Sequence, residues 1–190
     1  MAASQSAADP AKQYYSYNQI HALIQSSIPS FKDVPDALVL PEVAISGGGL
    51  IPARILRTLL KSRYKKTVPI RVIGLQLYDD DAEQIAAIGV KRTQWPCADE
   101  WGDVRNVLLV DEVDDTRTTL EYAVENLRRD LGKGVSIGVF VVHNKLKEKR
   151  GTLPKEVEYI AALDVEDLWV VYPWDAVDIE EHQRKCNEQR

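Results

Sequence analysis

The sequence predicts an α/β fold built on a parallel sheet, and two strand–loop–helix patterns carry this prediction. Residues 106–110 contain four consecutive apolar residues, followed by acids, a Thr-rich loop and a helical spacing of apolar residues from Leu120 to Leu131. Such an unbroken apolar run is typical of a strand buried on both faces of a parallel sheet. Residues 43–46 form a second short strand, which leads through three glycines into another helical pattern.

Length and composition indicate one globular domain. The chain has 190 residues, 45% hydrophobic and 28% charged, and a net charge of −5, which fits a soluble domain with a sizeable core. The acidic balance argues against a nucleic-acid-binding surface, and no apolar run is long enough to span a membrane. Because the two cysteines are scattered and the first residues lack the pattern of a secretory signal, we expect a cytoplasmic location.

The N-terminal part is expected to contain a tail and one helix. Residues 1–13, rich in Ala, Ser and Gln, are predicted to be a disordered tail, which leaves residues 14–190 as the domain. Apolar residues at near-helical spacing predict a helix over residues 14–27, with Ser16 or Asn18 as its N-cap. Three prolines then indicate a connector to the next strand.

Two further strands are predicted beyond the glycines. Residues 68–77 alternate in hydrophobicity as a strand does, and the acidic segment that begins at Tyr78 and Asp79 fits a solvated hairpin. Residues 135–143 are apolar and β-branched, which predicts a strand that ends just before Lys145. Aromatic residues near the C-terminus are by default expected in the core.

The stretch after residue 110 carries the strongest functional signal. Asp111 and Glu112 come at the carboxyl end of the central strand, where open α/β sheets bind ligands. Residues 115–119 lead into the first turn of a helix, whose N–H groups attract an anion. Since two adjacent carboxylates suit a pair of hydroxyls, the stretch predicts a pocket for a phosphorylated sugar.

These residues together resemble a known signature. Four apolar residues, an acid pair and then Asp115-Thr116-Arg117-Thr118-Thr119 follow the order of the 5-phosphoribosyl-1-diphosphate (PRPP) motif of type I phosphoribosyltransferases. Most members have Gly where Arg117 stands, and the form with Arg is similar to fungal hypoxanthine-guanine and xanthine phosphoribosyltransferases. The resemblance implies a twisted, mostly parallel sheet flanked by helices, with a small hood formed by about residues 14–30 and 150–185.

The resemblance assigns the sugar phosphate to this stretch. Asp111 and Glu112 would hold the ribose hydroxyls, and Asp115 would be the catalytic residue that accepts a proton from the purine. Arg117 would contact the phosphate or point to solvent. The expected 5′-phosphate loop comprises Asp115, Thr116, Arg117, Thr118 and Thr119.

Two other segments are assigned by the same resemblance. Ser46, Gly47 and Gly48 would form a pyrophosphate loop, with a cis peptide at Ser46–Gly47. Many purine-specific members have Lys or Arg at the position of Gly47, so the cation that neutralises the departing pyrophosphate is left open. Tyr78 and Asp79 would begin a flexible lid, which excludes water when it closes.

The purine site is expected near the C-terminus. Lys145 would donate to O6 of the base, Trp169 would stack on its ring and the backbone of Val170 would bind its edge. The Trp-x-x-x-Pro-Trp-Asp order is similar to that of bacterial xanthine-guanine and fungal purine enzymes. Mg²⁺ is the implied cofactor, and its expected ligands are Asp111, Glu112 and Asp175.

The implied reaction joins PRPP to hypoxanthine, guanine or xanthine at N9, in a homodimer or homotetramer, and releases pyrophosphate. Two alternatives stay open. A PRPP-sensing regulator of the same fold would keep the PRPP loop without catalysis, and a transferase for another base would have a different base pocket. Lys145 and Trp169 favour the purine enzyme.

Overall fold

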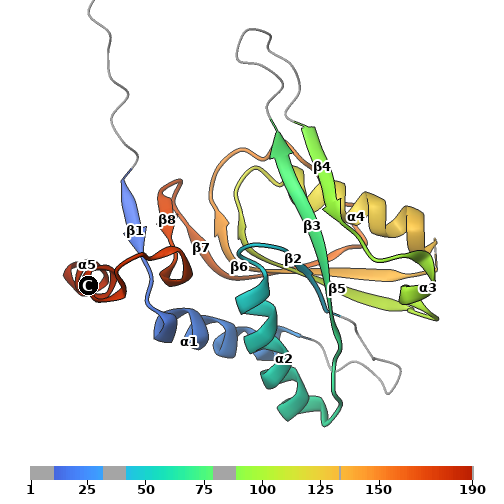
Figure 1. The fold of residues 1–190 in the computed structure, drawn as a ribbon, viewed down its shortest axis with the longest axis horizontal. Coiled ribbons are helices and arrows are strands. Elements are labelled where there is room, and N and C mark those ends of the chain that lie inside the picture. Colours follow the sequence, from blue (N-terminus) through green and yellow to red (C-terminus); the bar gives the residue numbers. More distant parts are fainter. Residues whose placement is uncertain (1–10, 32–41, 79–88, 133, 190) are drawn as a thin grey trace, which may run out of the picture.

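The computed structural model describes residues 11–31, 42–78, 89–132 and 134–189 (Figure 1). The predictions for residues 1–10 and for Asp79 lie outside these ranges. The elements in chain order are β1 (Lys12–Tyr14), α1 (Tyr17–Ser27), η1 (Ile28–Ser30), β2 (Glu42–Ile45), α2 (Leu50–Tyr64), β3 (Ile70–Tyr78), β4 (Gly89–Gln94), α3 (Ala98–Trp101), β5 (Asn106–Asp114), α4 (Thr118–Leu131), β6 (Ser136–Lys145), β7 (Glu158–Val165), β8 (Trp169–Val171), η2 (Pro173–Asp175) and α5 (Ile179–Glu188). Within the described ranges, no helix is long and apolar enough to cross a membrane.

A six-stranded, mostly parallel sheet forms the centre of the domain, which confirms the predicted fold class. Its strand order is β4-β3-β2-β5-β6-β7, and in this sheet the β3–β4 pair is antiparallel. The apolar run of β5 lies between β2 and β6, with Leu109 opposite Val43 on one side and Val139 on the other. The carboxyl ends of these three strands therefore share one edge, where the loops that follow them meet.

Helices cover both faces of the sheet (Figure 1). Helices α1 and α2 pack on one face, where Ile20, Leu56 and Phe140 are fully buried. Helix α4 packs on the other face, where Leu127 and Trp101 of α3 belong to a second buried cluster. Because both faces are covered, the central strands are apolar without alternation, as their sequence predicted.

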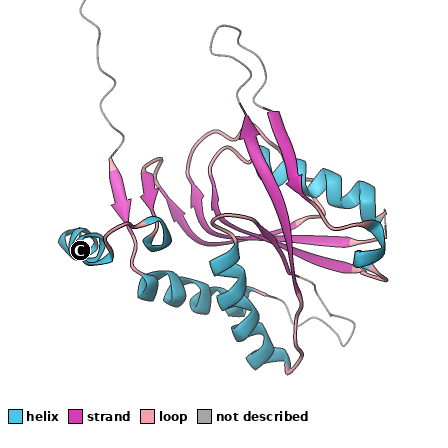
Figure 2. Cartoon of the chain, in the orientation of Figure 1, coloured by secondary structure: helices cyan, strands magenta, loops and turns pink. Residues whose placement is uncertain are grey.

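A second sheet lies beside the first (Figure 2) and changes two of the predicted boundaries. Strands β1 and β8 pair in parallel, with Lys12 opposite Trp169 and Gln13 opposite Val170. The prediction of a disordered tail through residue 13 was therefore wrong at Lys12 and Gln13, because these residues gain ladder hydrogen bonds from β8. The predicted hood was also wrong in part, since α1 and β7 belong to the main sheet and its cover.

Local sequence explains where two helices begin. Ser16 caps α1: its hydroxyl accepts from the Gln19 N–H at 3.2 Å, while Gln19 Oε1 accepts from the Ser16 N–H at 2.8 Å. This reciprocal capping box makes Tyr17 the first helical residue. Arg117 precedes α4 in a left-handed conformation, with φ of +67°, and α4 has no side-chain cap. Its first N–H groups therefore suit an anion at the ligand edge.

Strands β3 and β4 form a hairpin at one side of the sheet. Tyr78, assigned to the lid from sequence, is the last residue of β3 and pairs with Gly89. The sequence predicted the first strand of this hairpin but not the second. Whether a lid closes from here stays a prediction.

Candidate functional site

The predicted ribose-binding acids lie where β5 reaches the ligand edge. Asp111 is 7% exposed, and its Oδ1 accepts a hydrogen bond from the Glu112 N–H at 3.0 Å. Burial, and next the charge of Glu112, raises the pKa of Asp111 well above its ordinary value. Such a carboxylate pair is stabilised by a ligand that donates hydrogen bonds or gains positive charge.

The turn after β2 differs from its prediction. The described residues contain no cis peptide bond, so the cis bond expected at Ser46–Gly47 was wrong. Instead, the Ser46 N–H donates to the Ile73 carbonyl at 2.7 Å, and Gly47 reverses the chain with φ of +97°. Glycine is suited to this position because L side chains rarely adopt such a conformation.

The next two glycines bring this turn against the acid pair. A Cβ at Gly49 would be 2.6 Å from the Val110 carbonyl oxygen, and a Cβ at Gly48 would be 2.0 Å from Glu112 Cδ. The first contact excludes a side chain because backbone would have to shift. The second places the predicted pyrophosphate loop directly beside a predicted ribose ligand.

The Thr-rich loop between β5 and α4 is held by a later segment of the chain. The Thr116 carbonyl accepts from the N–H groups of Arg150 and Gly151, both at 3.0 Å. A Cβ at Gly151 would be 2.6 Å from the Arg117 carbonyl oxygen and 3.0 Å from the Thr118 nitrogen. The loop therefore enters α4 in one fixed path, with its amides ahead of the helix as an anion site requires.

The side chain of Arg117 is paired within the loop. Its Nε and Nη2 donate to Oδ2 of Asp114, at 2.9 and 2.7 Å, and its guanidinium lies over the Tyr159 ring. The Tyr159 hydroxyl donates to the same oxygen at 2.8 Å. Arg117 is therefore paired within the loop instead of pointing freely to solvent, because the buried Asp114 carboxylate requires a partner. Its contact with the phosphate stays a prediction. The spacing of three residues between Asp114 and Arg117 was the available signal.

Lys149 fastens the loop from the other side. Its Nζ donates to the carbonyl oxygens of Asp114, Asp115 and Lys145, at 2.7, 3.0 and 2.8 Å. The ends of β5 and β6 are thus tied through one ammonium group. Nothing in the sequence indicated this role for Lys149.

Asp115, the predicted proton acceptor, lies among cations. Its carboxylate oxygens are 2.8 Å from Lys147 Nζ and 3.4 Å from Lys145 Nζ, and both lysines also face Asp167. Burial acts to raise the pKa of Asp115, but its hydrogen bond to Lys147 and the charge of Lys145 together hold that pKa below its ordinary value. Asp115 is therefore ionised at neutral pH and is a hydrogen-bond acceptor. Sequence reasoning missed Lys147 and Asp167.

One cavity joins the acids to the predicted purine site. It has a volume of about 390 Å³. Its lining residues are Glu112, Val113, Asp115, Lys145, Trp169, Val170, Val171, Tyr172 and Asp175. Trp169 is 57% exposed, so its ring is accessible for stacking. Asp111, residues 116–119 and the pyrophosphate loop are not among its lining residues; they adjoin it through Glu112 and Asp115.

The carboxylates partly fit the implied Mg²⁺. Glu112 Oε2 is buried and has no hydrogen-bond partner among the described residues, which is consistent with a missing donor or cation. However, no group of three or more His, Cys, Asp or Glu side chains in the described ranges is placed to hold a metal ion. The structure therefore does not gather Asp111, Glu112 and Asp175 at one point, and the assignment of Mg²⁺ to these residues, with Asp175 beside the pyrophosphate, stays a prediction. Because Mg²⁺ keeps waters and binds substrate phosphates, two carboxylates suffice as protein ligands.

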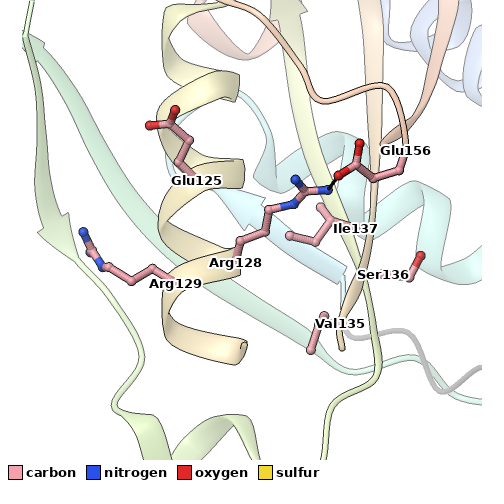
Figure 3. A pocket seen from close by; sticks show the side chains of 7 residues that line it. All are labelled: Glu125, Arg128, Arg129, Val135, Ser136, Ile137 and Glu156. Carbon is pink, nitrogen blue, oxygen red and sulfur yellow. Dashed lines mark ion pairs between the residues drawn. The ribbon is translucent and has the colours of Figure 1, made fainter. Parts of the chain in front are cut away.

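A second cavity, of about 620 Å³, lies at the opposite edge of the sheet (Figure 3). It is bounded by the start of β6 and the C-terminal half of α4, and its charged side chains include the ion pair of Arg128 with Glu156, at 2.9 Å. It has no acid pair and no helix N-terminus. We therefore place the functional site at the smaller cavity.

Comparison with known proteins agrees with the resemblance. The phosphoribosyl transferase domain model matches residues 11–176. The chain is 44% identical to the hypoxanthine-guanine phosphoribosyltransferase of Schizosaccharomyces pombe, over 92% of this chain and 94% of the relative. It is 43% identical to xanthine phosphoribosyltransferase 1 of Saccharomyces cerevisiae, over 92% and 95%. A crystal structure of a hypothetical protein from Neisseria gonorrhoeae with bound ppGpp superposes with a TM-score of 0.80, at 37% identity, over 95% of this chain and 98% of that one.

Proposed function

We infer that this chain, which belongs to the phosphoribosyl transferase domain family, is a 6-oxopurine phosphoribosyltransferase. It joins the 5-phosphoribosyl group of PRPP to N9 of hypoxanthine, guanine or xanthine and releases pyrophosphate. One observation carries the inference. A single cavity is lined by Glu112, which is assigned to the ribose, by the ionised Asp115, and by Lys145 and Trp169, which are assigned to the purine.

The sugar half of the reaction rests on the acids and the two loops. Asp111 and Glu112 accept from the ribose hydroxyls, and their charge favours the positive ring that forms as the C1–O bond breaks. Amides and hydroxyls of residues 116–119 bind the 5′-phosphate at the start of α4. The turn at Gly47 and Gly48 binds the leaving pyrophosphate through backbone N–H groups.

Binding and reaction of the purine depend on Lys145 and on Asp115, which lies beside it. Lys145 donates to O6, and Asp115 accepts the proton at N7. Because the pKa of Asp115 is lowered, it is a weak base, so the purine N–H becomes acidic as the ring bonds C1 and is not removed beforehand. Trp169 stacks on the ring, and the Val170 backbone binds the purine edge.

Mg²⁺ is the proposed cofactor. When bound, it offsets the negative charge that develops on the pyrophosphate oxygens. Asp111 and Glu112 are the residues that would hold it, directly or through water, because their oxygen ligands suit a hard cation. The cytoplasmic location and the homodimer or homotetramer stay predictions.

A steady-state assay tests the proposed function. The purified chain is given PRPP and Mg²⁺ with hypoxanthine, guanine, xanthine or adenine, and nucleotide formation is followed. We expect turnover with at least one 6-oxopurine and little with adenine. Tight PRPP binding without turnover on any base would instead identify a PRPP-sensing protein of the same fold.

A further inference from the structure

Beyond these groups, a buried chain of hydrogen bonds connects the side of the cavity proposed to bind the purine with Glu112, which is proposed to bind the ribose. The Tyr172 hydroxyl donates to the main-chain carbonyl of Glu112 at 3.0 Å, and His143 Nδ1 is 2.8 Å from the same hydroxyl. His143 is 0% and Tyr172 4% exposed. Tyr172 directly follows β8, the strand that carries Trp169 and Val170. The hydrogen bonds among Glu112, His143 and Tyr172 therefore connect three separate segments of the chain.

The hydrogen-bond pattern determines the tautomer of His143. A carbonyl oxygen can only accept, so the single Tyr172 proton must point to Glu112. The hydroxyl oxygen can then only accept from His143, which therefore carries its proton on Nδ1. Consistent with this, His143 Nε2 is buried and has no partner in the part of the chain that the structure describes.

The protonation states agree with this chain of donors. Burial lowers the pKa of His143 to about 4, so its imidazole is neutral at pH 7. A tyrosine hydroxyl is protonated at pH 7 even at its ordinary pKa, so Tyr172 keeps the proton that it donates. The Tyr15 ring packs against His143, with 4.3 Å between the two ring centroids, and shields the imidazole from water.

We propose that His143 is a positioning residue for PRPP: in its Nδ1–H tautomer it orients the Tyr172 hydroxyl, which fixes the Glu112 carbonyl and thereby the ribose-binding carboxylate. The proposal rests on the proposed function, because it assigns PRPP to this acid. Neither side chain needs to touch the substrate through these polar atoms. The same hydrogen bonds connect the purine-binding side of the cavity to the ribose site, so the two substrates are held in a fixed position relative to each other.

Kinetics provides the first test. Tyr172→Phe keeps the ring but removes the link, and we expect its KM for PRPP to rise by about tenfold, the equivalent of one lost hydrogen bond, with the purine KM within about twofold. His143→Leu should raise the PRPP KM in the same direction, and His143→Asn, whose amide N–H can replace Nδ1–H, should restore much of it. The double variant should be no worse than Tyr172→Phe, because His143 acts through the hydroxyl. Additive losses, or an unchanged PRPP KM in Tyr172→Phe, would overturn the proposal.

Matched controls separate positioning from general loss of structure. The exposed residues Tyr17 and His21, which are not among the lining residues of the cavity, supply the same substitutions, Tyr17→Phe and His21→Leu, and both should leave the PRPP KM unchanged. Thermal unfolding of every variant shows whether the kinetics were measured on folded protein. If a His143 variant unfolds at the assay temperature, the kinetic conclusion rests on Tyr172→Phe, which deletes one oxygen only.

A spectroscopic test does not depend on activity. The chain has 3 histidines, and ¹⁵N-histidine NMR at pH 7, assigned by the signal that His143→Leu removes, reports the tautomer. We expect the Nδ1–H form in the wild type and a changed tautomer population in Tyr172→Phe. An Nε2–H form in the wild type would overturn the proposal even if the enzyme is active, whereas absent turnover with the expected tautomer would count against the proposed function alone.

Discussion

The guanidinium of Arg117 and the carboxylate of Asp114 form a partly buried ion pair directly before α4. Asp114 is fully buried as a side chain, and Arg117, which donates to it twice, has a left-handed backbone. The pair is therefore built into the turn that the 5′-phosphate is proposed to occupy. A residue whose φ is unfavourable is kept there because its side chain satisfies a buried charge.

Arg117→Ala should lower the free energy of unfolding by about 2 kcal/mol, because it leaves the Asp114 carboxylate with fewer donors. The measurement is equilibrium denaturation. Adding Asp114→Asn removes the charge, so the double variant should recover part of the loss. The control is Arg184→Ala, which deletes exposed ion pairs with Glu181 and Glu188 and should cost clearly less stability than Arg117→Ala. Equal losses in the two Arg variants would contradict the buried pair.

How much of this site could be predicted from sequence depended on how local each signal was. The strand, acid pair and Thr loop at residues 106–120 were predicted because apolar runs and helical spacing are read within a short window. The hydrogen bond from Lys149 to the Asp114 carbonyl was not predicted, because the two residues lie 35 positions apart in the sequence. Likewise, Lys12 joins a strand only because β8, at the other end of the chain, pairs with it. Such contacts depend on the tertiary fold, so local composition does not predict them.

Lys147 should set the acidic limit of activity through Asp115. The Lys147 ion pair helps to hold the pKa of Asp115 below its ordinary value, so Asp115 stays ionised as the pH falls. In Lys147→Gln this lowering is lost, the pKa of Asp115 rises, and the acidic limb of the kcat/KM profile should move to higher pH. The measurement is kcat/KM for the purine from pH 4 to 8, with circular dichroism to show that the fold persists. Lys155→Gln, at an exposed lysine, is the control, and an acidic limb that does not move would remove Lys147 from this role.

Gly151 should be required for PRPP binding even though it is far from the loop in sequence. A Cβ there would be 2.6 Å from the Arg117 carbonyl oxygen, so Gly151→Ala must shift the phosphate loop. We expect kcat/KM for PRPP to fall by at least about tenfold, in line with the cost of overpacking. Gly134→Ala is the matched control, since a Cβ there meets nothing within 4 Å. Wild-type kinetics in Gly151→Ala would show that the loop adapts.

Glu42 should make the stability of the protein depend on pH. It is 0% exposed at the start of β2, and within the described ranges neither of its carboxylate oxygens has a hydrogen-bond partner. Burial raises its pKa to about 8, although the charges of Arg57 and Arg54 oppose this. Because the folded pKa lies above the unfolded value of about 4.5, the folded state binds the proton more tightly. The free energy of unfolding should therefore fall as the pH rises from about 5 to 8.

Glu42→Gln keeps the shape of the protonated acid and cannot ionise. It should remove this part of the pH dependence, so the variant should be more stable than the wild type at pH 8, by on the order of a few kcal/mol, and similar to it near pH 4. Other groups titrate in both proteins, so the informative quantity is the difference in unfolding free energy between them at each pH. Glu125→Gln, at an exposed glutamate on α4, should show no such difference. A difference that stays constant from pH 5 to 8 would mean that Glu42 ionises inside the fold as it does in the unfolded chain, which its burial without a partner argues against.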